Sequence, residues 1–192
     1  MSKFIVASCE IPEVKLLKPQ VFEDARGYFC ETYSERELCE AGIDLTFVQE
    51  NQSYSKLVNT VRGLHYQVPP FAQAKLVRVA RGAILDVAVD IRKGSPTLGK
   101  SVRRLLSEKN MEQLLVPEGF AHGFSVLEEN TIVIYKVTNY YSPQHERGIC
   151  WNDSELNIDW RLTTDEAILS KRDENHAVFE DAIDEEAFKL IA

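Results

Sequence analysis

The stretch KLVRVARGAILDVAVDIRKGSP, residues 75–96, decides the fold class of this chain. It contains two runs rich in Val and Ile, 75–79 and 84–91, in which apolar and polar residues partly alternate. Alternation of this kind over a short run is typical of β-strands. Arg81-Gly82 separates the two runs and Lys93-Gly94-Ser95-Pro96 follows them, so both runs end in turn-forming residues. The stretch therefore predicts consecutive short strands.

Similar runs continue on both sides of this stretch. They lie at 47–49 and 131–137, and Pro117-Glu118-Gly119 marks a further turn. Many short strands divided by Gly and Pro turns favour an antiparallel sandwich or barrel. Because the chain shows no linker, repeat or low-complexity segment, we expect residues 1–192 to form a single, mainly β domain.

Helices are expected at only two places. Ser34 and Glu37 have the spacing of a capping box, and Gly42 follows as a stop signal. The acidic tail, about 175–192, carries scattered apolar residues and could form one or two short surface helices. We interpret its charges as a solvated face.

The composition excludes several classes of protein. The 192 residues have a formal net charge of −8 and a pI of about 5.1, whereas a sequence-independent nucleic-acid binder is normally basic. No apolar run approaches the roughly 18 residues that span a bilayer, and Met1–Leu17 lacks the order of a signal peptide. The four cysteines are sparse and form no CxxC pair. We therefore expect a cytoplasmic protein with reduced thiols and with no nucleic-acid or membrane partner.

Histidine is scarce, and two of the four histidines have unusual neighbours. His122 lies in PEGFAHGF (117–124), which has the P-x-G-x-x-H spacing of the second motif of cupin barrels. In metal-binding cupins the first motif supplies an H-x-H pair, but here Gln67 stands two residues after His65. Two histidines are too few for the usual metal site, so we expect no metal. A histidine taken alone is more often a hydrogen-bonded core residue, but the cationic neighbours of His65 weaken that interpretation there.

Cationic side chains occur within strand-like sequence near His65. Alternation would point some of Arg62, Lys75 and Arg78 toward the interior. A buried cation needs an anionic partner, which could be a substrate phosphate or an internal carboxylate such as Asp86 or Asp90.

The spacing of Arg62 and His65 raises a difficulty of parity. They are three residues apart, so a regular strand would point them to opposite faces. Gly63 between them could mark a bulge that turns one of them to the other face.

Tyr135 and Asp173 have ordinary interpretations when taken alone. Tyr135 lies in TIVIYKV (131–137), on the same strand face as Val133 and Val137, which indicates a core aromatic. Asp173, in LSKRD, would ordinarily be a surface charge. Neither residue identifies a site by itself.

Taken together, eight segments resemble the dTDP-4-dehydrorhamnose 3,5-epimerase family, the RmlC-type sugar epimerases, over nearly the full chain. Several segments in the right order are far more specific than one. They are FEDARGYFCETY (22–33), FVQENQSYS (47–55), VRGLHYQ (61–67), AQAKLVRVARG (72–82), LDVAVDIRKGSPTLG (85–99), VPEGFAHGF (116–124), YKVTNYYSPQHERGICWND (135–153) and LSKRD (169–173).

The resemblance implies a cupin-like jelly-roll antiparallel β-barrel, a homodimer, and catalysis without metal or organic cofactor. The implied substrate is a dTDP-4-keto-6-deoxy sugar, whose C3 and C5 are inverted through an enolate in L-rhamnose biosynthesis. The implied catalytic residues are the base His65, its orienting carboxylate Asp173, the acid Tyr135 and the site lysine Lys75.

The resemblance also implies a set of substrate-binding residues. Arg172 stands where the family has a lysine, and the neighbouring Lys171 is the other candidate for that cation. Tyr141 or Tyr28 would stack on the thymine. The binding positions are Arg26, Glu31, Gln49, Asn51, Arg62, His122, Glu146, Arg172 or Lys171, and Tyr141.

Other functions stay open at this point. A metal-dependent cupin oxygenase or isomerase would need a third ligand beyond His65 and His122. A non-catalytic cupin that binds nucleotide sugars would need no base and acid. Among the epimerases, relatives that invert only C3 or only C5 share most of these motifs.

Overall fold

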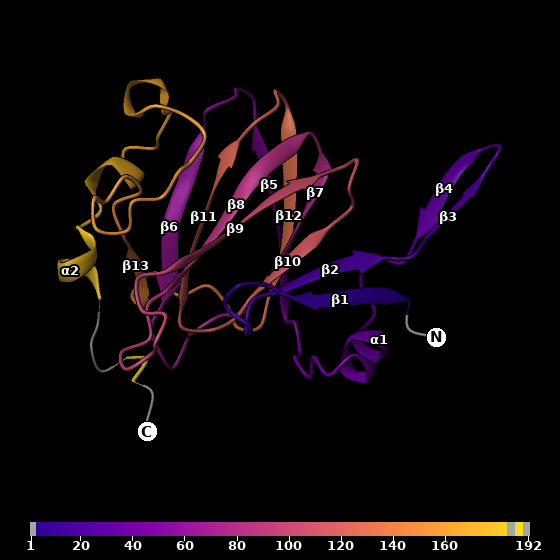
Figure 1. Ribbon diagram of the computed structural model, residues 1–192, viewed down its shortest axis with the longest axis horizontal. Helices are drawn as coiled ribbons and strands as arrows, with labels where there is room; N and C mark the ends of the chain where they lie inside the picture. Colours follow the sequence, from indigo (N-terminus) through magenta and orange to yellow (C-terminus); the bar gives the residue numbers. More distant parts are fainter. Residues whose placement is uncertain (1–2, 184–186, 190–192) are drawn as a thin grey trace.

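Two antiparallel sheets face each other in the computed structural model, which describes residues 3–183 and 187–189. The six-stranded sheet has the order β1 (Phe4–Ser8), β2 (Lys15–Pro19), β10 (Gln113–Val116), β7 (Lys75–Arg81), β12 (Thr131–Val137) and β5 (Gln49–Ser55). The five-stranded sheet has the order β13 (Glu146–Gly148), β6 (Val61–Gln67), β11 (Phe120–Val126), β8 (Ala83–Asp90) and β9 (Ser101–Ser107). The expected mainly β, antiparallel two-sheet architecture with few short helices is confirmed (Figure 1).

Strand β8 shows how the core is built. All of its residues are buried, because Ile84 and Ala88 face the interior between the sheets while Leu85 and Val87 face the outer side. A strand covered on both faces reads as a nearly continuous apolar run. Asp86 shares the inward parity of Ile84 and Ala88, so this strand also carries a carboxylate into the barrel.

The described part of the chain that follows β13 covers the outer face of the five-stranded sheet (Figure 1). Trp151, Trp160 and Phe179 are buried against it. The expectation that the tail forms short helices is confirmed, but the solvated face is only part of it, because Phe179 and Phe188 pack onto the barrel. The tail residue Leu190 lies outside the described residues. The helical turns here are η1 (Thr164–Glu166), η2 (Asp173–Asn175) and α2 (Phe179–Ala182).

The early helix α1 (Glu35–Glu40) begins where its cap predicts, but the capping box is only half formed. The backbone N–H of Glu37 donates to Ser34 Oγ (3.4 Å). The Glu37 carboxylate instead accepts a hydrogen bond from the backbone N–H of Lys3 (2.9 Å). The second half of the motif is therefore used to tie the helix to the start of β1.

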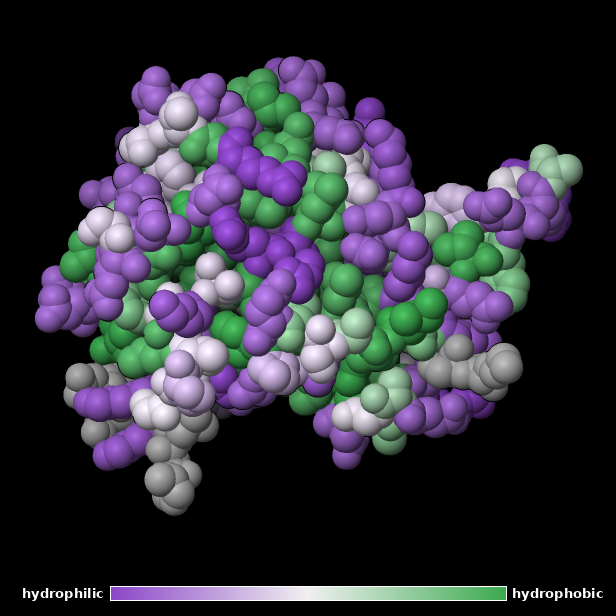
Figure 2. Space-filling view, viewed as in Figure 1, coloured by the Kyte–Doolittle hydropathy of each residue, from purple (hydrophilic) through white to green (hydrophobic). Residues whose placement is uncertain are grey.

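A two-stranded hairpin, β3 (Val21–Asp24) and β4 (Gly27–Cys30), projects from the barrel (Figure 1). Its side chains Phe22, Tyr28 and Phe29 are exposed. Figure 2 shows apolar patches among the polar side chains of this projection.

Strand β5 differs most from its sequence-based expectation. It begins at Gln49, where the expected strand 47–49 ends, and runs to Ser55. Its sequence QENQSYS has no apolar alternation, because one face of this strand lines a polar cavity instead of the core. Among the described residues, no helix has both the length and the apolar character needed to cross a membrane.

Candidate active site

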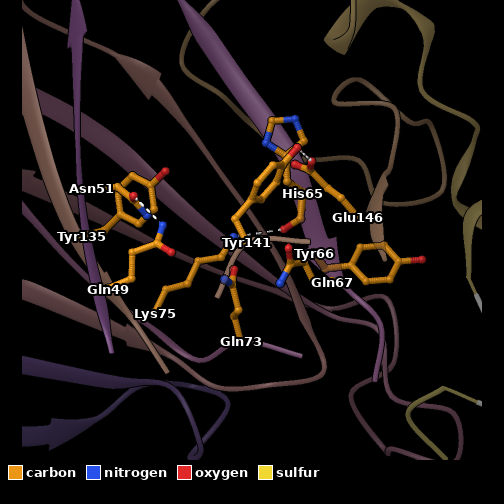
Figure 3. A pocket seen from close by; sticks show the side chains of 10 residues that line it. All are labelled: Gln49, Asn51, His65, Tyr66, Gln67, Gln73, Lys75, Tyr135, Tyr141 and Glu146. Carbon is orange, nitrogen blue, oxygen red and sulfur yellow. Dashed lines mark hydrogen bonds between the residues drawn. The ribbon is translucent and has the colours of Figure 1, made fainter. Parts of the chain in front are cut away.

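Two cavities of about 250 and 380 Å³ lie between the sheets and share part of their lining. The strands β6, β7, β12 and β13 all contribute, so both sheets build the site (Figure 3). A concave site lined by titratable groups is typical of an active centre. The shared lining residues are His65, Lys75, Tyr135, Tyr141 and Glu146.

A bulge in β6 brings Arg62 and His65 to the same cavity. In the pairing with β11, His65 lies opposite His122 and Arg62 opposite Phe124, so β6 carries one extra residue between the two pairs. A Cβ on Gly63 would lie 2.6 Å from the Cα of Gly123, so a side chain at this position would collide with backbone. The bulge expected at Gly63 is confirmed, and it resolves the difficulty of parity.

His65 and Asp173 form a hydrogen-bonded pair. His65 Nε2 lies 2.6 Å from Asp173 Oδ1, and Ser170 Oγ donates to the other carboxylate oxygen (2.8 Å). Burial alone would raise the pKa of Asp173, but the hydrogen bonds from His65 and Ser170 outweigh it and hold the pKa below its usual value. Because the lowered pKa keeps Asp173 ionised, its carboxylate accepts from Nε2–H, which leaves Nδ1 as the nitrogen without a hydrogen in the neutral tautomer of His65.

Tyr135 is both a core residue and a cavity residue. It packs against the apolar interior, as its Val neighbours indicate, and it lines both cavities. Burial raises its pKa, although the charge of Arg62 opposes the rise, so Tyr135 is a neutral proton donor at pH 7. His65 and Tyr135 lie on opposite sheets, with Lys75 between them in the view of Figure 3.

Lys75 brings a cation into the same cavity. Its Nζ donates to the backbone carbonyl of His65 (3.3 Å). Burial lowers its pKa to about 8, despite the opposing charges of Glu146 and Asp86. Arg78, three residues along β7, lines a different cavity on the other face of this strand, so only Lys75 of the two points inward.

Arg62 has no carboxylate partner among the described residues. Its guanidinium donates to Ser55 Oγ (3.2 Å) and to the carbonyl of Tyr54 (3.1 Å). The two internal carboxylates that could have neutralised it have other partners. His122 Nε2 donates to Asp86 Oδ1 (2.8 Å), and Arg92 donates to Asp90 Oδ2 (2.8 Å). Arg62 therefore presents its charge to the cavity.

Glu146 organises the mouth of the site. Its carboxylate accepts a hydrogen bond from Tyr141 Oη (2.5 Å) and forms an ion pair with Arg172 (2.6 Å). The Glu146 contact holds the pKa of Arg172 above its usual value. Of the two candidate cations, the structure places Arg172 in the cavity lining, whereas Lys171 is not among the lining residues.

Gln49 and Asn51 lie side by side on β5. Gln49 Nε2 donates to Asn51 Oδ1 (2.7 Å), and Asn51 pairs with Tyr135 of β12. Both amides line the cavity next to Tyr135, where they can bind hydroxyl groups.

The structure does not bring Arg26, Glu31 or Tyr28 to this cavity. Arg26 lies at the tip of the projecting hairpin, where its side chain is 90% exposed and pairs with Asp24. Glu31 forms an ion pair with Lys3 (2.6 Å). The cavity of one chain therefore contains only part of the binding set that the sequence resemblance implies.

Two residues around His65 were missed at the level of sequence, Ser170 and His176. Ser170 precedes Asp173 by three residues, and its hydroxyl also accepts from the backbone N–H of Asp173 (3.1 Å), a spacing that the LSKRD segment shows directly. The ring of His176 stands edge-on to that of His65, with the centroids 5.3 Å apart. This histidine lies in the acidic tail, where nothing in the sequence marks it.

His65, Asp173 and His176 are a group in the described part of the chain whose ligand atoms all lie within 4.8 Å of one another. The 2.6 Å separation of His65 and Asp173 is a hydrogen-bond distance. Two ligands of one tetrahedral ion with bonds of about 2.1 Å lie roughly 3.4 Å apart. The observed arrangement therefore fits a proton better than a metal ion between these two groups.

Comparison with known proteins gives a consistent result. The family model of dTDP-4-dehydrorhamnose 3,5-epimerase matches residues 8–181. The dTDP-4-dehydrorhamnose 3,5-epimerase of Sinorhizobium fredii is 51% identical over 167 residues, which cover 86% of this chain and 85% of that protein.

Solved structures agree in fold over almost the whole chain. RmlC from Legionella pneumophila, in complex with dTDP-4-keto-L-rhamnose, superposes with a TM-score of 0.91 at 40% identity and covers 98% of this chain and 99% of that one. ChmJ, a 3'-monoepimerase from Streptomyces bikiniensis, superposes with a TM-score of 0.83 at 30% identity, over 90% of this chain and 87% of that one.

Proposed function

This chain belongs to the dTDP-4-dehydrorhamnose 3,5-epimerase family, and we propose that its cavity inverts C3 and C5 of a dTDP-linked 4-keto-6-deoxy sugar. One observation carries the proposal. A His–Asp pair and a neutral tyrosine line one cavity from opposite sheets, beside Arg62 and Lys75, two cations with no carboxylate hydrogen bond or ion pair in the described residues. Proton removal and return at carbons next to a ketone needs this combination of groups.

His65 is the base in this proposal. The hydrogens on C3 and C5 are acidic because loss of either one gives an enolate with C4. Nδ1 of His65 takes the proton, and Asp173 stabilises the imidazolium through Nε2–H (2.6 Å). His65 then passes that proton to solvent.

Lys75 stabilises the enolate oxygen. The negative charge that develops on O4 needs a cation already in place, and Lys75 is the ammonium group beside His65 in the cavity. Burial destabilises the charged form of Lys75. A nearby enolate therefore stabilises the Lys75 ammonium group more than it would stabilise that of an exposed lysine.

Tyr135 returns a proton to the other face of the ring. The phenol O–H bond breaks and a C–H bond forms at the enolate carbon, which leaves a tyrosinate that regains a proton from solvent. Arg62 supports that tyrosinate, since its charge favours the ionised form of Tyr135. Each inverted carbon therefore exchanges one hydrogen with water.

The remaining cations and amides hold the substrate. Arg62, Arg172 and His122 bind the diphosphate, for which a planar guanidinium is well suited. Gln49 and Asn51 bind sugar hydroxyls. Tyr141 stacks on the thymine from the mouth of the cavity. No metal or organic cofactor has a part in these steps, so dialysis against a strong chelator leaves the activity intact.

A second copy of the chain completes the site. Arg26 and Glu31 do not line their own cavity, and Phe22, Tyr28 and Phe29 are exposed on the hairpin that carries Arg26. An apolar projection of this kind buries its surface when it packs against a partner. We therefore infer a homodimer in which each hairpin delivers Arg26 to the diphosphate in the partner's cavity.

The chain is nearer to 3,5-epimerases than to the monoepimerase, at 51% against 30% identity. We therefore expect exchange at both carbons.

The four cysteines of the chain are free, in keeping with a cytoplasmic enzyme.

Proton NMR of dTDP-4-keto-6-deoxy-D-glucose incubated with the enzyme in deuterium oxide tests the function. The expected result is loss of the H3 and H5 signals together with formation of dTDP-4-keto-L-rhamnose. Exchange at one carbon alone would identify a monoepimerase. A bound substrate without exchange at either carbon would contradict an epimerase and indicate a binding protein.

A further inference from the structure

The described residues include His176, a histidine beside His65 that the mechanism above does not use. The His176 side chain is about nine-tenths buried, at 10% exposure. It directly follows η2, the turn that carries Asp173, and its ring contacts that of His65 edge-on, at an interplanar angle of 83°. A buried titratable group in contact with a catalytic base needs a physical reason to be there.

The place of His176 is built by a missing side chain on β13. Gly148 lies opposite His65 in the β6–β13 pairing, where a cross-strand neighbour would normally pack against it. A Cβ on Gly148 would lie 2.2–2.4 Å from the ring atoms of His176. The imidazole of His176 therefore occupies the position that a side chain of residue 148 would fill.

Backbone contacts hold His176 in that position. The next residue, Ala177, forms a parallel bridge with Ile149, and its carbonyl accepts a hydrogen bond from the N–H of Cys150 (2.7 Å). The chain is thus fixed on both sides of the ring, by η2 before it and by this bridge after it.

The polar edge of His176 points at the carboxylate that holds the base. Its Nε2 lies 3.4 Å from Asp173 Oδ1, the same oxygen that His65 contacts at 2.6 Å. The separation is too long for a strong hydrogen bond, and Nε2 has no other partner in the described part of the chain. Burial and then the charge of His65 lower the pKa of His176, so at neutral pH it is an uncharged dipole beside Asp173.

We propose that His176 is a positioning residue of the base, which fixes the orientation of the His65 ring and shares the Asp173 carboxylate with it. This rests on the proposed role of His65 in proton abstraction. Because Asp173 Oδ1 faces two Nε2 atoms, its hold on the protonated form of His65 is weaker than in an isolated pair. Because Asp173 stabilises the imidazolium less strongly, His65 can release its proton to solvent after each deprotonation of the sugar.

Other charged and titratable groups face His65, and the variants compared below leave all of these groups unchanged. They face it from η2, β6, β7, β11, β12, β13 and the segment before η2. These groups are Asp173, Arg62, Lys75, His122, Tyr135, Glu146 and Arg172.

The test compares His176→Phe, which keeps a ring and loses the nitrogens, with His176→Gln, which keeps an amide donor. For His176→Phe we expect kcat to fall roughly tenfold, as for a slightly misplaced catalytic group, with KM little changed. The acidic limb of the kcat/KM profile should move to higher pH by about half a unit, because Asp173 then holds the His65 proton more tightly. In His176→Gln the acidic limb should stay close to its wild-type pH.

Gly148→Ala is an independent way to displace the ring, and we expect it to shift the acidic limb in the same direction. His145→Phe, at a histidine that binds Ser142 and does not line the cavity, is the matched control and should leave the limb in place. If His176→Phe does not fold, the Gln and Gly148 variants carry the test.

The outcomes separate the two proposals. His65→Asn that keeps exchange activity would show that the proposed base is wrong. If His65→Asn is inactive but the His176 variants lower kcat with an unshifted acidic limb, or change nothing, His176 has only a packing role and the present inference is wrong.

Discussion

Lys75 is the residue at which stability and function conflict most clearly. Burial lowers its pKa to about 8, so the folded protein disfavours the charge that the proposed enolate step requires. The strand pattern marks Lys75 only as a cation, and the family resemblance marks it as the site lysine. The strength of the conflict depends on burial, which no local pattern shows.

Replacing this lysine should therefore stabilise the protein and inactivate it. A shift from 10.5 to about 8 corresponds to a penalty on the order of 3 kcal/mol at neutral pH, and cavity water reduces it. We expect Lys75→Met to raise the free energy of unfolding by about 1–3 kcal/mol in urea titrations at pH 7. Lys109→Met, at an exposed lysine, is the control and should change little. A destabilised, fully active Lys75→Met enzyme would contradict this role.

The same residue sets a pH dependence. A lysine with a lowered pKa loses its charge as pH rises through about 8, so the enolate loses its cation there. We expect kcat/KM, which reports the free enzyme, to fall above pH 8. Lys75→Arg, which stays charged, should lose rate but lack this basic limb. A wild-type profile that stays level to pH 10 would show that Lys75 is not required in its charged form.

At the scale of elements, the bulge in β6 brings Arg62 and His65 to one cavity. Gly63 has a φ of +117° and lies within contact of Gly123 on β11, so both its conformation and its space exclude a side chain. The spacing of Arg62 and His65 predicted this feature because a regular strand could not serve both.

We expect Gly63→Ala to destabilise the fold by on the order of 3 kcal/mol and to abolish activity, since the clash involves backbone that cannot rotate away. The control is Gly42→Ala, at a glycine with φ of +82° and nothing within 4 Å of an added Cβ. Gly42→Ala should lower the free energy of unfolding by only about 1 kcal/mol, the cost of placing an alanine at a positive φ. Equal thermal stability of the two variants would argue against the close approach.

Other elements show where sequence reasoning stops. The strand 131–137 was predicted at its true bounds, because one face of β12 packs into the apolar core. The polar strand β5 was mostly missed, since its partner is a cavity and not a core. His176 was missed because its place depends on the absence of a side chain at Gly148, on a different strand.

At the scale of the whole molecule, the positions of the expected substrate-binding residues bear on how two copies of the chain assemble. Arg26 and Glu31 were implied by resemblance, yet a single chain holds them away from its cavity. A resemblance to a family identifies individual site residues, but it does not show which copy of the chain contributes each residue to a site.

Mixed dimers distinguish the two cases. If the partner delivers Arg26, a dimer of one His65→Asn chain and one Arg26→Ala chain has one intact site and one doubly defective site. Co-expression of the two variants should recover about a quarter of wild-type activity, because half of the dimers are mixed and each has one good site. If Arg26 acts in its own chain, or the protein is a monomer, no activity returns above that of the separate variants.

The central claim is that His65 and Tyr135 move protons on opposite faces of the sugar ring. The measurement that tests it most directly follows deuterium incorporation and inversion separately, by NMR in deuterium oxide, for His65→Asn and Tyr135→Phe, with Tyr140→Phe as an exposed control. His65→Asn should lower both rates by on the order of 10²–10⁴, because the base is gone. Tyr135→Phe should keep incorporation at C3 or C5 while inversion falls, since His65 can still remove a proton and return one to the same face. Loss of incorporation and inversion in equal proportion in Tyr135→Phe, or full inversion in that variant, would contradict the account.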